Sequence, residues 1–243
     1  MSHQDKMKIE IWSDIACPFC FIGKHQLEKV LTKFPHAEFI ETSWKTFILD
    51  PTISADSQQS LYSYLATVKG IEIEQVKKLT QHINQRANDV GLKFDFDHSI
   101  VANTLNAHRL SHLAKTKGAE LQNKAEELLF TAYFIESKDI NNLDVLVEIG
   151  TKLGFDQLEV ENVIQKKKFT KDIEADGQEA IALGINVVPY FLFNKQLAIS
   201  GVQTEEKILE TLETAYQQWK NKITTKDTTT IKGSSCSLDG HCE

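Results

Sequence analysis

Cysteine is scarce in this sequence and absent from its middle. The 243 residues include four cysteines, and these are Cys17, Cys20, Cys236 and Cys242. A disulfide-rich secreted scaffold is excluded, because such small folds depend on many bridges, whereas a chain of this length buries enough core without them. The fold therefore does not depend on disulfides.

Positive charge is also in deficit, with 27 Lys and Arg against 34 Asp and Glu and a net charge of −7. Proteins that bind nucleic acid usually present a basic surface, so this balance argues against a nucleic-acid partner. The longest basic cluster, at 166–168 with Lys171, is mixed with acidic residues and is typical of a solvated helix face.

Long apolar runs are missing as well. No stretch approaches the roughly 18 residues that cross a bilayer, so we expect no membrane partner. Residues 1–12 lack the apolar segment of a secretory signal and pass directly into a strand-like pattern. We therefore expect a cytoplasmic protein, in which a Cys-x-x-Cys pair is more often catalytic or metal-binding than structural.

The first fifty residues predict a strand, a helix and a second strand. Apolar and polar residues alternate over 7–12, and apolar residues then recur at helical spacing until Pro35. Residues 38–49 are rich in aromatic and β-branched side chains, as strands are. From about 60 to 168, six helical patterns follow one another without a convincing strand between them.

Strand character returns in the last third of the chain. Residues 186–193 and 197–200 are separated by a polar turn and predict a hairpin. A helical pattern from about 204 to 220 follows. Residues 221–243 are rich in Thr, Lys and Ser, and we expect a mobile tail there.

The segment Cys17-Pro18-Phe19-Cys20 lies where the first predicted strand passes into the first helix. Cys17 occupies the predicted N-cap, and Pro18 the first helical position, where its missing N–H costs nothing. The positive end of the helix dipole favours a thiolate at Cys17. Cys20, one turn further in, is close enough to close a small ring. We predict that Cys17 is the nucleophile, open to a partner, and Cys20 the resolving thiol.

The cysteine pair has two other interpretations. A structural zinc site usually needs four ligands, and Cys236 with Cys242 would complete the set only from a tail. His108 and His112 share a helix face but lack an obvious third ligand. Two incidental cysteines are the remaining alternative. The placement between a strand and a helix favours redox chemistry, and we predict no metal.

Four blocks of the sequence can be compared with known families. They are Trp12-Ser-Asp-Ile-Ala-Cys17-Pro-Phe-Cys20-Phe-Ile-Gly23-Lys24, Asn103-Thr104 with Ala107-His108-Arg109-Leu110, Ala132-Tyr133-Phe134 with Asp139-Ile140, and Gly184-Ile185-Asn186-Val187-Val188-Pro189-Tyr190-Phe191 with Ile199-Ser200-Gly201. In this order, over about residues 8 to 220, these blocks resemble those of cytosolic DsbA-family oxidoreductases of the FrnE type.

The resemblance implies an α/β fold, a thioredoxin-like fold (β-α-β … β-β-α) with an inserted all-helical domain. The thioredoxin-like domain would be discontinuous, formed by residues 7–58 and 169–220. The helical insertion would span 59–168, and the tail that contains the last two cysteines would span 221–243. This layout agrees with the element order read from the sequence patterns.

The resemblance also implies that the Val188–Pro189 bond is cis and lies beside the cysteine pair. In such folds this loop presents its backbone to the substrate chain, and Val188 fills that place here. Pro18 and Phe19 would support the site. Phe19 stands where family members commonly have Trp, and Val187 where they commonly have Gly. The reduction potential and the substrate preference of the family therefore cannot be assumed for this chain.

Further residues are candidates for the substrate cleft. Asn103, His108 and Arg109 match a block that lines the cleft in related glutathione-using enzymes, with capping and packing as the alternative roles. Asp14, three residues before Cys17, is a candidate for proton transfer or a turn residue. In the tail, Cys236 and Cys242 are candidates for an auxiliary redox pair that exchanges with the first pair, or are exposed thiols without a role.

The function expected from the motif and the resemblance is thiol–disulfide exchange with protein thiols and disulfides. The working group would be the redox-active disulfide itself, with no other cofactor, and glutathione or a thioredoxin system would recycle it. The main alternative is a glutathione-dependent isomerase or transferase acting on a small organic substrate. That chemistry does not need the second cysteine. A redox-gated holdase or zinc-binding module is the non-enzymatic alternative.

Overall fold

The computed structural model describes residues 6–221 and the backbone of 229–232 and 236–237. Among these residues, no helix combines the length and the apolar character needed to span a membrane. The elements in chain order are β1 (Met7–Ser13), α1 (Pro18–Lys33), the short η1 (Ala37–Phe39), β2 (Ile40–Thr46), α2 (Leu61–Lys69), α3 (Ile73–Asn88), α4 (Leu105–Lys115), α5 (Ala119–Phe130), η2 (Thr131–Ile135), α6 (Leu143–Lys152), α7 (Gln157–Gln165), α8 (Thr170–Ala182), β3 (Val187–Val188), β4 (Tyr190–Phe193), β5 (Leu197–Ser200), α9 (Glu205–Lys220), β6 (Thr229–Lys232) and β7 (Cys236–Ser237).

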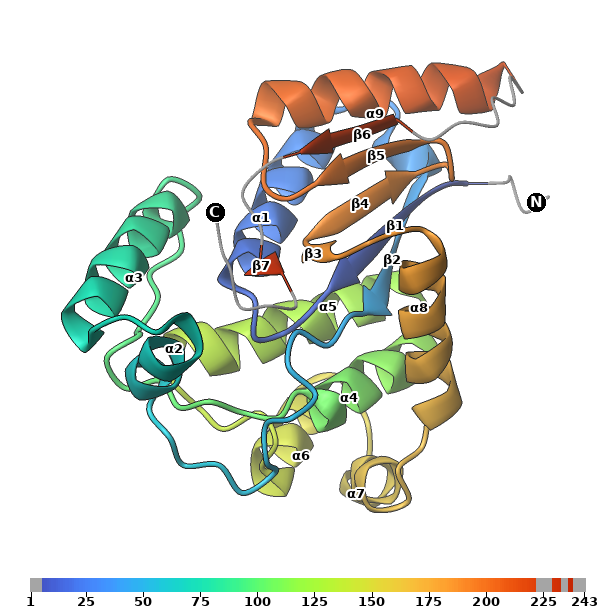
Figure 1. Cartoon of the computed structure of the whole chain (residues 1–243). Coiled ribbons are helices and arrows are strands. Elements are labelled where there is room, and N and C mark those ends of the chain that lie inside the picture. The colour runs from blue at the N-terminus through green and yellow to red at the C-terminus, as the bar shows by residue number, and fades with distance from the viewer. Residues whose placement is uncertain (1–5, 222–228, 233–235, 238–243) are drawn as a thin grey trace.

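A mixed sheet forms the centre of the molecule, with the strand order β2-β1-β4-β5-β6 (Figure 1). The first strand pairs in parallel with β2 and antiparallel with β4. The predicted β-α-β opening and the later hairpin are therefore confirmed, and the architecture is the DsbA-like thioredoxin fold. The segment between β2 and β3 contains the six helices that the sequence patterns predict, α2 to α7.

One face of the sheet packs against α1 and α9. Gly23 of α1 lies so close to the sheet that a Cβ atom there would be 3.0 Å from the ring of Phe191. A glycine at this position therefore lets the helix approach the strands. The last helix, α9, contacts α1 and the strands β4 and β5.

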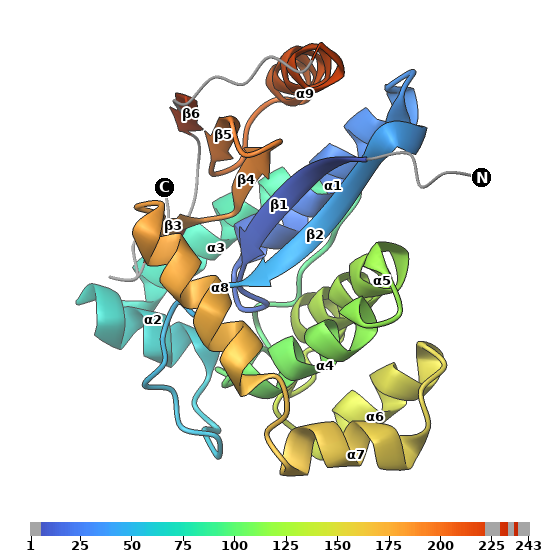
Figure 2. The ribbon, with the colours of Figure 1, turned by 90° about the vertical axis from the view of Figure 1, so that its right-hand side faces the viewer.

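The opposite face packs against α8, which the sequence patterns did not predict (Figure 2). The indole of Trp12 donates a hydrogen bond to the carbonyl of Asp176 at 3.1 Å. The Thr46 amide donates to the Asp176 carboxylate at 2.8 Å. Only Ile173 and Ala180 supply buried apolar side chains in this helix. Two buried apolar residues are too few to produce a helical pattern in the sequence, and polar contacts hold the helix against the sheet.

Aromatic stacking connects the inserted helices to α1. The ring of Phe21 stacks on Phe130 with centroids 5.0 Å apart, and on Phe94 at 5.8 Å. At the edge of the sheet, the Gln122 side chain of α5 hydrogen-bonds both the amide and the carbonyl of Trp44. This contact satisfies part of the open edge of β2.

The tail departs from the expectation of a mobile segment over 221–243. Residues 229–232 form β6, which pairs in parallel with β5, and residues 236–237 form β7, which pairs antiparallel with β3. The β-branched run Thr229-Thr230-Ile231 has the high strand propensity that such pairing needs. Cys242 lies outside the described residues.

Candidate active site

The cysteine pair lies at the start of α1, as the sequence predicts. Cys17 is the N-cap residue, with an extended backbone, and Pro18 follows in the first turn. The Cys17 amide donates to the carbonyl of Asp14 at 3.0 Å, and the Cys20 amide donates to the carbonyl of Cys17 at 3.0 Å. This turn places Cys17 at the positive end of the helix, where backbone amides stabilise negative charge.

Cys17 and Cys20 are free thiols. Burial raises the pKa of Cys20 well above its usual value, and the adjacent Cys17 raises it further through a hydrogen bond and its charge. Contacts from Ser13 and the Asp14 backbone oppose the shift without cancelling it. Cys20 is therefore held as a thiol that can donate a hydrogen bond to the Cys17 sulfur. Of the two sulfurs, Cys20 is thus the one that its surroundings keep protonated.

The second part of the site is the loop at Pro189. The Val188–Pro189 peptide bond is cis, as the family resemblance implies. The Cys17 thiol donates to the carbonyl oxygen of Val188, with the sulfur 3.7 Å from that oxygen. A Cβ atom on Gly23 would lie 3.2 Å from Cγ of Pro189, so this glycine also allows α1 to pack against the loop.

Access to Cys17 differs from the expectation. The motif predicts a nucleophile open to a partner, whereas Cys17 is 0% exposed. The strand beside it is already paired, because residue 236 of β7 lies opposite Val188 and residue 237 opposite Val187. A client strand that binds the same edge therefore has to displace the tail segment first.

Asp14 lies directly before the turn and is 1% exposed. Its carboxylate accepts from the Ala16 amide at 3.2 Å and from the Leu49 amide at 2.7 Å. It thus ties the active-site turn to the segment that follows β2. His108 Nε2 lies 3.5 Å from the Asp14 carboxylate. This nitrogen has no hydrogen-bond partner among the described residues. The fold therefore brings His108 close to Asp14, beside the candidate site.

Asn103 and Arg109 make contacts that support the inserted helices. The Asn103 amide donates to the carbonyl of Ile53 at 2.8 Å, and its oxygen accepts from the Leu105 amide at 3.0 Å. Arg109 donates to the Thr170 hydroxyl at 2.8 Å, which ties α4 to the start of α8. Both residues therefore make capping or packing contacts in this structure.

The two histidines of α4 do not converge on a common point. His108 faces Asp14, whereas His112 Nε2 lies 3.3 Å from the Asp176 carboxylate and 3.0 Å from the Thr46 hydroxyl. Burial alone would raise the pKa of Asp176, but hydrogen bonds from His112 and the Thr46 amide hold it below its usual value. His112 therefore serves the docking of α8 on the sheet.

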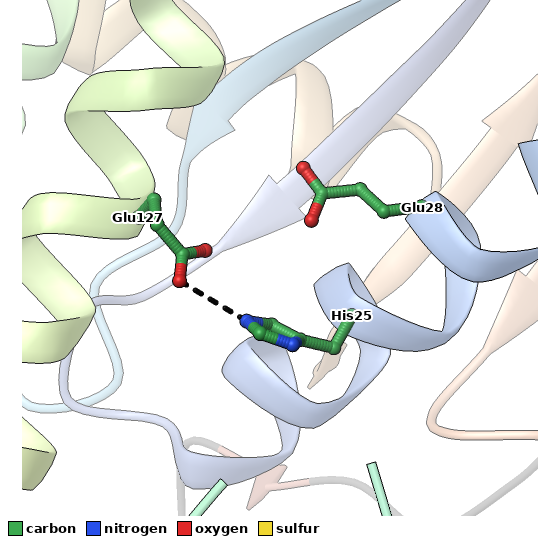
Figure 3. Close-up of side chains that lie close together, drawn as sticks. All are labelled: His25, Glu28 and Glu127. Carbon is green, nitrogen blue, oxygen red and sulfur yellow. Dashed lines mark hydrogen bonds and ion pairs between the residues drawn. The ribbon is translucent and has the colours of Figure 1, made fainter. Parts of the chain in front are cut away.

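A separate cluster, His25, Glu28 and Glu127, brings three metal-binding side chain types together (Figure 3). His25 Nε2 lies 3.1 Å from the Glu127 carboxylate. The buried Lys24 ammonium lies 2.7 Å from Glu28 and 2.6 Å from Glu127. Because this lysine already supplies a positive charge to both carboxylates, the cluster is an ion-pair network that joins α1 to α5.

A cavity of about 540 Å³, which the sequence patterns do not reveal, lies beside the turn that contains Cys17. Its lining includes Ala16, Pro18 and Phe19 of the turn, residues of α2 and α3, and residues of the loops before α2 and after α3. Asp14 also lines it, whereas Asn103, His108 and Arg109 are not among its lining residues. The apolar faces of α2 and α3 are visible in the sequence, but nothing in their pattern shows that these faces enclose a space.

The chain is similar in sequence and in structure to several known proteins. It is 25% identical over 197 residues to the uncharacterised protein YwbO of Bacillus subtilis, and the match covers 76% of this chain and 85% of that one. The crystal structure of a probable DsbA oxidoreductase, SCO1869 from Streptomyces coelicolor, is similar with a TM-score of 0.82 and 30% identity, over 98% of both chains. A 2-hydroxychromene-2-carboxylate isomerase is similar with a TM-score of 0.63 and 12% identity, over 90% of this chain and 100% of that one.

The isomerase shares the fold alone, so the fold does not by itself distinguish disulfide exchange from isomerase chemistry. The model of the DSBA-like thioredoxin domain matches residues 8–213, which contain the cysteine pair, the inserted helices and the cis-proline loop. The chain belongs to the family of DSBA-like thioredoxin domains.

Proposed function

We propose that this chain is a thiol–disulfide oxidoreductase that acts on protein thiols and disulfides through Cys17 and Cys20. The observation that carries the proposal is the position of Cys17. It caps α1, its sulfur lies 3.7 Å from the Val188 carbonyl, and Cys20 is buried behind it with a raised pKa. The proposed nucleophile Cys17, the proposed resolving thiol Cys20 and the Val188 backbone proposed to bind the substrate thus lie next to one another.

In the reducing direction, the Cys17 thiolate attacks one sulfur of a client disulfide. The client S–S bond breaks, and its other sulfur leaves as a thiolate that takes up a proton. Cys20 then loses its proton and attacks the Cys17 sulfur, which forms the Cys17–Cys20 disulfide and releases the client's second thiol. The client gains the two electrons that the pair loses, so an external thiol must restore the pair.

The remaining members of the site hold this geometry. Pro18 starts the helix without an unpaired amide, and Phe19 forms a wall between the turn and the cavity. Val188 presents its backbone to the client chain, and Pro189 holds that loop against α1. Asp14 fixes the turn from behind through the Ala16 and Leu49 amides.

The proposed compartment is the cytoplasm, and the proposed recycling partner is glutathione or a thioredoxin system. In a reducing compartment the balance of the exchange favours reductase or isomerase work over oxidation. The proposal includes no nucleic acid and no membrane. Cys236 and Cys242 are proposed as an auxiliary pair, supported by the pairing of residue 236 with Val188.

Reduction of insulin disulfides by a thiol donor tests the proposal. The full chain is expected to accelerate the reaction, and Cys17→Ser is expected to lose all acceleration because the attacking sulfur is gone. Retained activity in Cys17→Ser would show that another group does the chemistry.

The second candidate is a glutathione-dependent isomerase or transferase, favoured by the apolar cavity beside the active-site turn. That chemistry needs one cysteine, so Cys20→Ser separates the two functions. Conjugation of glutathione to a small electrophile that persists in Cys20→Ser would support the second candidate. Loss of disulfide reduction without any conjugating activity supports the first.

A further inference from the structure

Ser13, the last residue of β1, has a buried hydroxyl that is left without a partner. The residue is 1% exposed, and its Oγ atom has no hydrogen-bond partner among the described residues. A buried hydroxyl in this situation costs free energy, because it has lost its hydrogen bonds to water. Alanine would avoid this cost at the same position, so the stability of the fold does not account for a serine here.

The alternation of side chains along β1 places Ser13 on the face of the sheet that packs against α1. Its neighbour Trp12 points to the opposite face, where its indole donates to the carbonyl of Asp176 in α8. Successive side chains of a strand point to opposite faces, and β1 stays in register with β2 up to the pair of Ser13 and Thr46. The Ser13 side chain therefore faces α1. Cys20 belongs to the first turn of this helix.

The Cys20 sulfur is an ionisable group that the Ser13 hydroxyl approaches on this face. Burial raises the pKa of Cys20, and the hydroxyl lies close enough to oppose this rise, although it forms no hydrogen bond while Cys20 is a thiol. The backbone of Asp14 acts in the same direction. Both groups therefore favour the thiolate, as hydrogen-bond donors do. Because Cys20 is 0% exposed, its thiolate depends on donors from the protein.

A mixed disulfide with a client changes the balance at Cys20. In the reduced protein, burial raises the pKa of Cys20 most, and Cys17 adds to the rise through a hydrogen bond and its charge. When a client is bonded to Cys17, that sulfur carries no charge, so the repulsion is gone and burial is the main obstacle to ionisation. The Ser13 hydroxyl has no other bond to break, so it can turn its proton toward the thiolate as a donor that is already in place.

We propose that the Ser13 hydroxyl is a catalytic donor that stabilises the Cys20 thiolate while this thiolate attacks the Cys17 sulfur of the mixed disulfide. The inference rests on the proposed function and assigns a residue to its second step. Cys20 first loses its proton to the solvent, and its sulfur then bonds to the Cys17 sulfur. The bond between Cys17 and the client breaks, and the client sulfur leaves with the electron pair and takes up a proton. Ser13 keeps its own proton throughout.

Asp14 and His108 are further ionisable groups beside this turn. The Asp14 carboxylate accepts from the amides of Ala16 and Leu49, and His108 Nε2 lies 3.5 Å from it. Both residues are the same in the wild type and in every Ser13 variant, so their titration affects all of these proteins alike. A difference between the variants therefore reports the Ser13 hydroxyl.

A peptide whose single cysteine is joined by a disulfide to thionitrobenzoate separates the two steps in the full-length reduced protein. Release of thionitrobenzoate, the better leaving group, measures the attack by Cys17. Decay of the peptide adduct on Cys17, followed by mass spectrometry after an acid quench, measures resolution by Cys20. Ser13→Ala should slow resolution by about three- to tenfold, because the thiolate loses a hydrogen bond but becomes a somewhat better nucleophile. Attack should still proceed in this variant.

Titration of Cys20 gives a readout that a misplaced side chain would not reproduce. In Cys17→Ala, the carbon NMR signal of the labelled Cys20 side chain follows its ionisation without the neighbouring thiol. Adding Ser13→Ala should raise the pKa of Cys20, because a donor to the thiolate is lost. A loosened structure that admits water would lower this pKa instead.

Ser99→Ala is the matched control, since Ser99 is 2% exposed and its hydroxyl donates to the carbonyl of Asp95 at 2.6 Å. It should keep the wild-type resolution rate and the titration of Cys20. Ser13→Thr retains a hydroxyl and should resemble the wild type in both measurements. In urea unfolding, Ser13→Ala should be at least as stable as the wild type, because its hydroxyl has no partner to lose.

The outcomes separate the role of Ser13 from the proposed function. If the wild type releases no thionitrobenzoate, the proposed function fails and the role of Ser13 fails with it. If attack is observed but Ser13→Ala resolves at the wild-type rate, or leaves the pKa of Cys20 unchanged or lowered, Ser13 is not the donor and the proposed function stands. A larger loss of stability in Ser13→Ala than in Ser99→Ala would assign the hydroxyl to the fold and also overturn the proposal.

Discussion

At Cys20, burial and the neighbouring Cys17 both favour the protonated form, and together they raise the pKa of this thiol. In the proposed mechanism, a protonated Cys20 protects the mixed disulfide from immediate resolution, because only the thiolate attacks sulfur. The time that a client would stay attached to Cys17 would then depend on how readily Cys20 loses its proton.

The first prediction concerns the pH dependence of this step. Below a raised pKa the thiolate fraction of Cys20 grows about tenfold per pH unit, so the release of a client from Cys17 should accelerate by roughly a hundredfold between pH 6 and 8. Single-turnover decay of a peptide mixed disulfide measures it. A rate that is level across this range would contradict the assigned role of Cys20.

At the scale of single residues, the sequence predicted where Cys17 and Cys20 lie in the fold but did not predict their surroundings. The spacing of Cys17 and Cys20 is local, so a strand-to-helix junction is enough to place them. The contact between Asp14 and His108 joins residues that lie far apart in the chain, and it depends on how α4 docks. No periodicity in the sequence encodes that distance.

At the scale of elements, Gly23 is the point at which α1 packs closely against both the sheet and the cis-proline loop. A Cβ atom there would lie 3.0 Å from the Phe191 ring and 3.2 Å from Pro189. By contrast, a Cβ atom on Gly177 of α8 would meet no atom within 4 Å. Both glycines lie within helices, and they differ in whether the structure has room for a side chain.

The second prediction compares alanine at these two sites. Gly23→Ala should destabilise the protein by about 1–3 kcal/mol, because the added methyl group displaces α1 from well-packed neighbours, and it should also lower disulfide reduction. Gly177→Ala should stabilise it by about 0.5–1 kcal/mol through helix propensity. Urea unfolding measures both. Equal effects at the two sites would show that α1 does not need the close approach.

The third prediction concerns the anchor of α8. The pKa of Asp176 is held below its usual value, so the stability that its carboxylate supplies is present above about pH 4 and is lost as the pH falls through the folded-state pKa. Asp176→Asn should cost about 1–3 kcal/mol at pH 7, and this difference should shrink toward zero in acid. Urea unfolding at several pH values tests it, and a cost independent of pH would contradict the assignment.

The same helix shows why some elements escaped sequence analysis. The helices α2 to α7 repeat apolar residues at helical spacing and were predicted. In α8 two buried apolar residues stand beside the buried Asp176, so tertiary hydrogen bonds do part of what an apolar stripe does elsewhere. The strands β6 and β7 were missed because a polar, Thr-rich composition was interpreted as a mobile tail.

At the scale of the whole molecule, the two halves of the chain meet at the candidate active site. The N-terminal half supplies Cys17, and the C-terminal half supplies both the cis-proline loop and the strand β7 that pairs beside it (Figure 1). The resemblance to a known family predicted that Cys17 and the cis-proline loop lie together. The position of β7 depends on pairing across the fold, which composition does not reveal.

The fourth prediction tests the proposed auxiliary pair. If Cys236 and Cys242 exchange with the active-site pair, then changing both to Ser in one chain should lower insulin reduction several-fold and shift the reduction potential of Cys17 and Cys20. Turnover with glutathione as donor and equilibration in glutathione buffers measure the two effects. Unchanged turnover and potential would remove the tail cysteines from the mechanism.

The central claim is that Cys17 attacks client disulfides and Cys20 resolves the product. Incubating Cys20→Ser with a disulfide-containing client and analysing the product by non-reducing mass spectrometry tests it most directly. A stable adduct in which the client is bonded to Cys17 is predicted, together with the lack of any adduct when Cys17 is also changed to Ser. Adducts formed equally without Cys17, or no adduct on Cys20→Ser, would contradict the account.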